Sequence, residues 1–451
     1  MTERLTTETA GIRRLKFKLN GGLNSSSLHG SIRVPGDKSI SHRSIMLASL
    51  AEGTSHVSGF LEGEDSLNTV RAFRAMGVNI DGPADGKVTI QGVGMAGLNA
   101  PAQSLDLGNS GTSMRLLAGL LAGQKFDVEL RGDASLSGRP MKRVTDPLSA
   151  MGARIETAEG GTPPLKIAGN QTLKAISYQM PVASAQVKSC CLLAGLYARG
   201  KTCVTEPAVT RDHTERMLKA FGCDVEVSGA TACVTGPAKL VATDIDVPAD
   251  ISSAAFFMVG ASIAEKADVE LLHVGINPTR TGVIEILKLM GADIALTNQR
   301  EVGGEPVADI RVKNTRLKGI HVPEDLVPLA IDEFPILFIA AACAEGQTVV
   351  TGAEELRVKE SDRIQVMADG LQALGVDARA TDDGMVIQGG EIGEGTVSSH
   401  GDHRIAMSFA MAALRASGDI HIEDCKNVNT SFPGFAELAA SCGLPIQIID
   451  Y

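Results

Sequence analysis

Six apolar, alanine-rich stretches recur along the 451-residue chain, each preceded by small polar or charged residues. They begin near Lys38, Asn109, Ser184, Ser252, Asp332 and Asp402. After its first turn, each stretch is hydrophobic almost all round, which is typical of a buried helix and not of an amphipathic surface helix. A strand-like run such as FDVEL, ADVELL or DIHI follows each stretch within a few residues. The pattern therefore predicts six buried helices that each lead into a strand.

A second, shorter element alternates with these stretches. It is a helix that ends in an apolar residue and a glycine, followed by a strand, as in FRAMGVNI or LKLMGADI. Glycine just past a helix end adopts the left-handed conformation that closes the last turn. Its six glycines are Gly77, Gly152, Gly222, Gly291, Gly375 and Gly443. The two elements together define a unit of about 70 residues that occurs six times.

A chain of this length exceeds one ordinary hydrophobic core, so two domains of three units each are expected. We assign residues 1–28 to a flexible extension, 29–242 to the first domain and 243–451 to the second. The segment PAKLVATDIDVPAD is the expected crossover between the domains.

Composition and charge exclude several classes of partner. The net charge is -11 and aromatic residues make up 3% of the chain, with no Trp. Nucleic-acid binding relies on a basic surface and on aromatic stacking, so it is not expected. No apolar run approaches the ~20 residues of a membrane span, and we expect a cytoplasmic protein. The eight cysteines include no CxxC pair, which favours reduced, buried thiols over a disulfide framework.

The first turns of the buried helices carry an unusual charge. A helix N-terminus favours acidic side chains, and its free amides form a ready anion site. Here the first turns hold cations instead: Lys38 and Arg43, Arg115, Lys188, and the pair His403 and Arg404. Cations at several helix starts predict a shared receptor for anions. The alternative, for any one of them, is a solvated surface charge.

Small polar residues and two loops extend this prediction. The stretch LGNSGTSMR would let backbone amides approach a ligand closely, although similar stretches also begin ordinary helices. Ser184 and Gln186 offer hydrogen-bond donors, with an ordinary N-cap as the alternative for Ser184. The loop of residues 131–143 carries Arg139, and the segment 356–363 carries three charged residues within about one helical turn, for which surface ion pairing is the alternative. Those three are Lys359, Glu360 and Arg363.

Two carboxylates among these cations suit proton transfer. Asp332 begins a strongly apolar helix, where N-capping is its alternative role, and Glu360 stands between Lys359 and Arg363. An acid and a base in a cationic cleft suit addition across a polarised double bond. The spacing of His42 and His403 completes no metal site, so neither a metal nor an organic cofactor is expected.

Several segments of the chain resemble those of 5-enolpyruvylshikimate-3-phosphate synthases, in order from about residue 30 to the end. The similarity is greatest to the bacterial group that includes glyphosate-tolerant forms. The matching segments are VPGDKSISHRS (34–44), LGNSGTSMR (107–115), GRPM (138–141), SAQVKS (184–189), TRDHTE (210–215), NPTRTG (277–282), IDEFPIL (331–337), LRVKESDR (356–363) and DHRIAMS (402–408). This resemblance implies an α/β fold of two similar domains, each of three βαβαββ repeats with buried helices and outer sheets. It also implies a monomer whose substrates are phosphoenolpyruvate and shikimate 3-phosphate.

The resemblance further implies the role of each site residue. Lys38, Ser39 and Arg43 would contact both substrates. Shikimate 3-phosphate would also be bound by Ser184, Ala185, Gln186, Arg211, Asp332 and Lys359. Phosphoenolpyruvate would be bound by Lys38, Gly111, Arg139, Gln186, Arg363 and Arg404. Some relatives have a lysine where this chain has Thr430, so Thr430 is left out of the site. Ala185 stands where other relatives have a serine.

In the expected mechanism Asp332 removes the proton of the 5-hydroxyl as that oxygen attacks phosphoenolpyruvate. Glu360 or Lys38 protonates the methylene carbon, and phosphate then leaves. The room beside Gly111 makes the enzyme an expected glyphosate target.

One rival function is that of the related transferase that acts on UDP-N-acetylglucosamine, but the reactive cysteine of that transferase is missing from residues 131–143. The other rival is a catalytically dead anion-binding protein, against which the intact Lys38, Asp332 and Glu360 argue.

Overall fold

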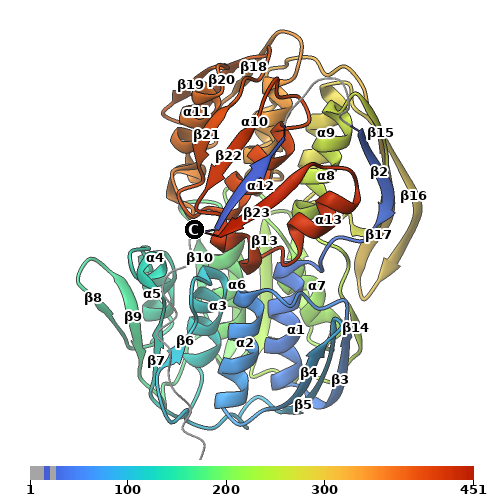
Figure 1. The fold of residues 1–451 in the computed structure, drawn as a ribbon. Coiled ribbons are helices and arrows are strands. Elements are labelled where there is room, and N and C mark those ends of the chain that lie inside the picture. Colours follow the sequence, from blue (N-terminus) through green and yellow to red (C-terminus); the bar gives the residue numbers. More distant parts are fainter. Residues whose placement is uncertain (1–14, 21–26, 451) are drawn as a thin grey trace, which may run out of the picture.

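The computed structural model describes residues 15–20 and 27–450, which form two halves stacked on one another (Figure 1). The six predicted buried helices are all present. They are α1 (Lys38–Leu50), α3 (Gly111–Leu121) and α6 (Ala185–Gly195) in the first half, and α8 (Ile251–Ile263), α10 (Phe334–Ala342) and α12 (His403–Ala412) in the second. Every residue of α8 and of α10 is buried, as their uniformly apolar sequences predict.

The starts of these helices are well defined by capping. Side chains of Asp37, Ser110, Ser184, Asp250 and Asp402 each accept a hydrogen bond from a backbone amide of the first turn. Such caps satisfy amides that have no partner within the helix. The remaining buried helix, α10, is instead entered through the short 3-10 helix η2 (Ile331–Glu333), which includes Asp332.

The second predicted element is also confirmed. Its helices are α2 (Glu64–Ala75), α5 (Lys142–Ala150), α7 (His213–Ala220), α9 (Gly282–Leu289), α11 (Arg363–Ala373) and α13 (Phe435–Ser441). The glycine beyond each helix has a positive φ, from 80° at Gly222 to 110° at Gly443. The remaining helical segments are α4 (Ala134–Ser137), η1 (Glu324–Leu326), η3 (Glu354–Val358) and η4 (Cys425–Thr430).

Three sheets cover the first half. Their strands are β3 (Glu52–Ser58), β4 (Asn79–Ala84), β5 (Lys87–Val93), β6 (Leu105–Asp106), β7 (Val128–Arg131), β8 (Ile155–Ala158), β9 (Thr162–Ile167), β10 (Ser177–Gln179), β11 (Gly200–Thr205), β12 (Val225–Ser228), β13 (Thr231–Gly236) and β14 (Ile245–Asp246). The strand orders are β14-β3-β5-β4, β6-β7-β9-β8 and β10-β11-β13-β12. In each sheet the first two strands are parallel and the rest antiparallel, so one topology occurs three times.

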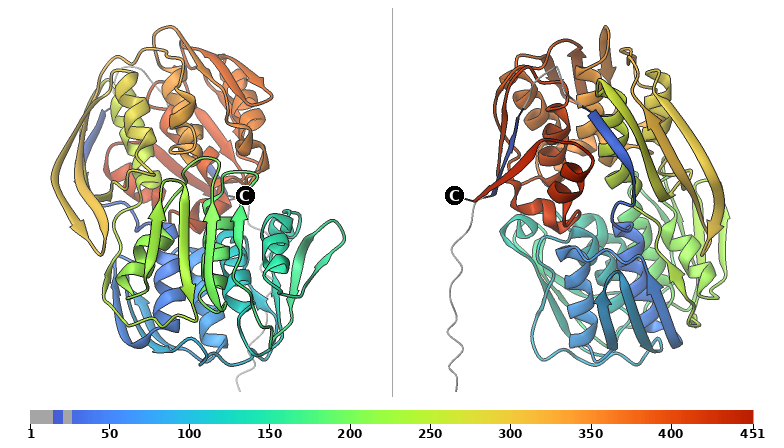
Figure 2. Two further views of the ribbon diagram at one scale, coloured as in Figure 1. Left: turned by 180° about the vertical axis from the view of Figure 1, so that it is seen from behind. Right: turned by 45° about the vertical axis from the view of Figure 1, so that its right-hand side comes forward.

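Three more sheets cover the second half (Figure 2). Their strands are β1 (Leu15–Leu19), β2 (Ser27–Ile32), β15 (Lys266–Gly275), β16 (Asp293–Val302), β17 (Glu305–Lys313), β18 (Gln347–Val350), β19 (Asp377–Thr381), β20 (Gly384–Gln388), β21 (Gly395–Ser398), β22 (Ile420–Glu423) and β23 (Ile446–Asp450). The orders are β16-β17-β15-β2, β18-β20-β19 and β21-β22-β1-β23. With buried helices and outer sheets, the α/β fold is the one that the resemblance implied.

The predicted domain boundaries need correction at both crossovers. Strand β1 pairs with β22 and β23, and β2 pairs with β15, so both strands belong to the second half. Segment 15–19 therefore completes a sheet and is no loose extension, while residues 1–14 and 21–26 lie outside the described residues. In the same way β14 pairs with β3 of the first half. The partners of these strands lie far away in sequence, and a local hydrophobic pattern holds no information about them.

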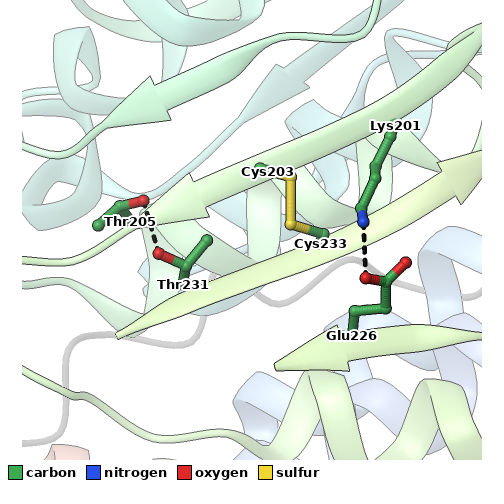
Figure 3. Close-up of a disulfide and its surroundings, with 6 residues drawn as sticks. All are labelled: Lys201, Cys203, Thr205, Glu226, Thr231 and Cys233. Carbon is green, nitrogen blue, oxygen red and sulfur yellow. Dashed lines mark hydrogen bonds and ion pairs between the residues drawn. A yellow bond between two sulfur atoms is a disulfide. The ribbon is translucent and has the colours of Figure 1, made fainter. Parts of the chain in front are cut away.

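The prediction of reduced cysteines is wrong for one pair. Cys203 on β11 and Cys233 on β13 lie directly opposite one another in the antiparallel ladder and form a disulfide (Figure 3). The other six cysteines are free, and five of them are buried. The register of the two strands places these cysteines opposite one another, and their separation of 30 residues in the sequence does not indicate this pairing. Among the described residues, no helix is both long and apolar enough to cross a membrane.

Candidate active site

The N-terminal ends of all six buried helices meet at one cavity between the two halves. Its lining includes Lys38 and Ser39 of α1, Gly111, Thr112 and Arg115 of α3, Gln186 of α6, Asp250 at the start of α8, Asp332 ahead of α10, and His403 and Arg404 of α12. The cavity volume is about 110 Å³. A larger space of about 390 Å³ adjoins it and is lined by Ser184, Ala185, Gln186, Arg211, Asp332 and Lys359, among others. Five residues line both: Gln186, Arg211, Asp332, Glu355 and Lys359.

Positive charge dominates this cavity. Nine of its lining residues are cationic and five are carboxylates, an excess of four positive charges in a chain whose net charge is -11. The cations are Lys38, Arg115, Arg139, Arg143, Arg211, Arg280, Lys359, Arg363 and Arg404. A local concentration of one sign in a concave site attracts small ligands of the opposite sign, whatever the charge of the whole protein. Cations from several helix starts therefore do line one cavity, as the sequence predicts.

Asp332 lies at the junction of the two spaces. Its carboxylate accepts a hydrogen bond from Arg211 of the first half and pairs with Lys359 at 3.4 Å and Arg363 at 3.5 Å. Burial raises the pKa of Asp332, but the surrounding cations outweigh burial and hold that pKa well below its usual range. Asp332 is therefore ionised, and the same cations make it a weaker base than a free carboxylate until anions engage them.

Glu360 lies on the opposite side of Arg363. Its carboxylate pairs with Arg363 at 2.7 Å and with Arg139, which comes from the other half, at 3.8 Å. Burial raises its pKa, while the positive charges of Arg363, Arg139 and Lys38 together lower it well below the ordinary value. Glu360 therefore carries a negative charge among these cations.

The loop before α3 and the start of α6 are joined by side chains. Arg139 donates to Asn109 at 2.8 Å, and Arg115 donates to the Gln186 side chain at 2.5 Å. A Cβ atom at Gly111 would lie 3.2 Å from a guanidinium nitrogen of each arginine. Glycine here leaves the two guanidinium groups free to face the cavity.

Sequence reasoning assigned no specific role to several residues that line this cavity, among them Arg115, Arg143 and Glu355. Arg115 was noted only as a cation at a helix start, and its Nε is buried without a hydrogen-bond partner among the described residues. Arg143 and Glu355 form an ion pair of 3.1 Å that joins the two halves. Arg143 lies in the predicted polar loop, but its pairing with Glu355 depends on how the halves are stacked.

Two predicted cations do not reach the cavity. Lys188 has a side chain only 3% exposed and is held between Glu206 and Glu215, both at 2.8 Å, so its predicted role in anion binding is wrong. Arg43 is also buried, and it donates to Thr214, to Ser189 and to the Ser39 carbonyl oxygen. Burial lowers the pKa of Arg43 to about 10, which leaves it charged at neutral pH. Both side chains point from the helix start toward the interior of the first half.

The structure also places three further residues that the sequence analysis named. Ser184 caps α6, which confirms its alternative role as an N-cap, and it also lines the larger space. Thr430 donates to the Asn427 carbonyl oxygen within η4. Burial lowers the pKa of His403 to about 3, so this histidine is neutral. Within the described part of the chain, no three His, Cys, Asp or Glu residues are grouped as metal ligands.

A cationic cleft between two sheet-covered halves, with ionised carboxylates among its cations, is typical of a protein that binds small anions. Comparison with known proteins identifies the family. The family model for EPSP synthase (3-phosphoshikimate 1-carboxyvinyltransferase) matches residues 24–438. The chain therefore belongs to the EPSP synthase family.

Individual relatives agree with this family. The 3-phosphoshikimate 1-carboxyvinyltransferase of Methylococcus capsulatus is 69% identical over 93% of this chain and 96% of its own length. That of Alkalilimnicola ehrlichii is 68% identical over 93% and 94%. A solved structure of EPSP synthase from Acinetobacter baumannii has 62% sequence identity and a TM-score of 0.88, covering 96% of this chain and all of that one.

Proposed function

We propose that this cleft transfers the enolpyruvyl group of phosphoenolpyruvate to the 5-hydroxyl of shikimate 3-phosphate and releases phosphate, as the names of its relatives state for those proteins. The observation that carries the proposal is the position of Asp332. This ionised carboxylate lies where the two adjoining spaces meet, among cations from both halves. Two anionic substrates in these spaces would meet at a base.

The two spaces suggest how the substrates are arranged. Shikimate 3-phosphate would occupy the larger space, where Ser184, Ala185, Gln186, Arg211 and Lys359 offer donors and positive charge. Phosphoenolpyruvate would occupy the smaller one, beside Lys38, Gly111, Arg139, Arg363 and Arg404. Guanidinium groups suit its carboxylate and phosphate because each presents two parallel donors. Gln186 lines both spaces and would contact both substrates.

Ser39 and Arg43 have different parts in this arrangement. Ser39 lines the smaller space, whereas Arg43 lies behind it and donates to the Ser39 carbonyl oxygen at 2.9 Å. Arg43 would therefore act through Ser39, by fixing the first turn of α1, and would not touch the substrates in this arrangement.

The reaction would proceed by addition and elimination. Asp332 removes the 5-hydroxyl proton as that oxygen bonds to C2 of phosphoenolpyruvate, and the C3 methylene takes a proton to become a methyl group. The methyl then loses a proton as the bond from C2 to the phosphate oxygen breaks. Cations already held around the cleft stabilise the charge that develops, without reorganising during the reaction.

The state of Glu360 decides when it could supply the C3 proton. Arg139 and Arg363 keep its carboxylate ionised. Once the anionic groups of phosphoenolpyruvate engage these arginines, the attraction that lowers its pKa weakens and protonation becomes favourable. Lys38, which pairs with Asp65, is the alternative donor on the same cavity.

Phosphate release tests the proposal directly. The protein is mixed with phosphoenolpyruvate and one of three acceptors: shikimate 3-phosphate, shikimate or UDP-N-acetylglucosamine. We expect rapid release with shikimate 3-phosphate and at least a hundredfold slower release with the other two. Shikimate lacks the phosphate, and UDP-N-acetylglucosamine is a much larger molecule with a diphosphate linkage in place of the phosphate monoester. Release that is fastest with UDP-N-acetylglucosamine, or absent with all three, would contradict the proposal.

A further inference from the structure

The two crossovers between the halves lie side by side. Residues 33–37 lead from β2 of the second half into α1 of the first, and residues 247–250 lead from β14 of the first half into α8 of the second. The amide of Asp37 donates to the Pro248 carbonyl oxygen at 2.8 Å, and the amide of Asp250 donates to that of Pro35 at 2.9 Å. Any change in the angle between the halves must alter the backbone of this paired hinge, since the chain crosses nowhere else in the described residues.

One buried cation holds the end of both crossovers. Arg280 lies between β15 and α9 in the second half, in the segment NPTRTG, and its side chain is 3% exposed. Nη1 donates to Asp37 at 3.0 Å, and Nη2 donates to Asp250 at 3.2 Å and to Ser252 at 2.7 Å. The same Nη2 lies 3.8 Å from Glu333. The planar guanidinium therefore reaches carboxylates from both crossovers and from η2 at once.

Each of these partners is next to a group of the proposed reaction. Asp37 caps α1 directly before Lys38, and the Lys38 amide donates to Asp250 at 3.2 Å. Glu333 directly follows Asp332. Arg280 thus connects the backbone that carries Lys38 in one half to the backbone that carries Asp332 in the other.

We propose that Arg280 is a positioning residue that fixes the observed arrangement of the two halves and thereby holds Lys38 and Asp332 at one cavity. This inference rests on the proposed function. Arg280 lines the cavity and carries one buried Nε without a partner among the described residues, yet the rest of its guanidinium faces the hinge. Its contribution to the reaction is therefore made through the hinge carboxylates.

Substitution separates this role from a structural one. In Arg280→Gln the three carboxylates lose their shared partner, and the two crossovers lose the ion pairs that hold their ends together. Arg280→Lys keeps the charge, but an ammonium group lacks the planar fork that bonds Asp37 and Asp250 together. Arg311→Gln is the matched control, because Arg311 forms its ion pair with Asp268 on an exposed sheet face and not with a residue of either crossover.

The experiment measures kcat and KM for phosphoenolpyruvate, and the Kd of shikimate 3-phosphate alone by calorimetry. For Arg280→Gln we expect kcat/KM to fall about 100-fold, the loss typical of a misplaced reacting group. The Kd should change less than threefold, because most donors of the larger space come from the first half. Arg280→Lys should lie between wild type and Arg280→Gln, and Arg311→Gln should match wild type.

Two results would overturn the inference. One is a kcat/KM for Arg280→Gln within twofold of wild type. The other is an equal loss in kcat/KM and in affinity for shikimate 3-phosphate, which would indicate general disruption of the fold. If Arg280→Gln does not fold, the same comparison is made in Arg280→Lys: the loss in kcat/KM must exceed the loss in affinity for shikimate 3-phosphate. A wild-type protein that releases no phosphate from the two substrates would overturn the proposed function instead.

Discussion

Replacing Asp332 by Asn tests the proposed base without changing the shape of the site. The amide cannot remove a proton, and loss of a general base typically slows a reaction 10²–10⁴-fold, so we expect kcat to fall about 10³-fold, or about 4 kcal/mol in the barrier. The substitution also removes one of the five carboxylates that line the cavity, which raises its excess of positive charge from four to five. The KM for phosphoenolpyruvate should therefore stay the same or decrease while kcat collapses.

Steady-state phosphate release over a range of phosphoenolpyruvate concentrations gives both constants. Glu355→Gln is the matched control: Glu355 lines the same cavity and pairs with Arg143 and Lys359, so its loss changes the cavity charge equally. We expect less than a tenfold loss of kcat in this control. Equal losses of kcat in both variants, or an Asp332→Asn variant that loses affinity for shikimate 3-phosphate as much as kcat, would refute the assignment of Asp332 as the base.

Four further results are expected. Because the pKa values of Asp332 and Glu360 are lowered by folding, these groups stabilise the protein above about pH 4 and this contribution is lost on acidification, which urea unfolding at several pH values measures. Lys188→Met leaves two buried glutamates unpaired and should cost about 3–5 kcal/mol in the free energy of unfolding, seen as a lower Tm. Gly111→Ala places a Cβ 3.2 Å from the guanidinium of Arg139 and should raise the KM for phosphoenolpyruvate more than that for shikimate 3-phosphate. Thiol titration of the denatured protein should find six reactive cysteines before reduction and eight after it.

Local sequence was sufficient to predict the repeated part of the fold. Uniformly apolar stretches such as that of α10 have one stable location, the interior, and the glycine after each shorter helix marks its end. The unusual cations at Lys38 and Arg404 indicated a site because they oppose the helix dipole unless an anion is present. These signals depend on neighbours within one or two turns, which is why they can be read from the chain alone.

Features that depend on distant partners could not be predicted. Strand β1 pairs with β22 and β23, which lie more than 400 residues away in the sequence. The hydrophobic pattern of β1 does not indicate which strands it pairs with. Lys188 carries the same signal as Lys38, but it pairs with Glu206 and Glu215, whose positions depend on the loop after β11. The disulfide of Cys203 depends in the same way on the register of two strands.

The most direct test is a crystal structure of the protein with shikimate 3-phosphate bound. The central claim is that helix starts from both halves form one receptor in which a phosphorylated acceptor lies against Asp332. We predict density in the larger space, with the phosphate near Ser184 and Lys359 and the 5-hydroxyl within hydrogen-bond distance of the Asp332 carboxylate. A ligand bound outside this space, or with its 5-hydroxyl turned away from Asp332, would contradict the account.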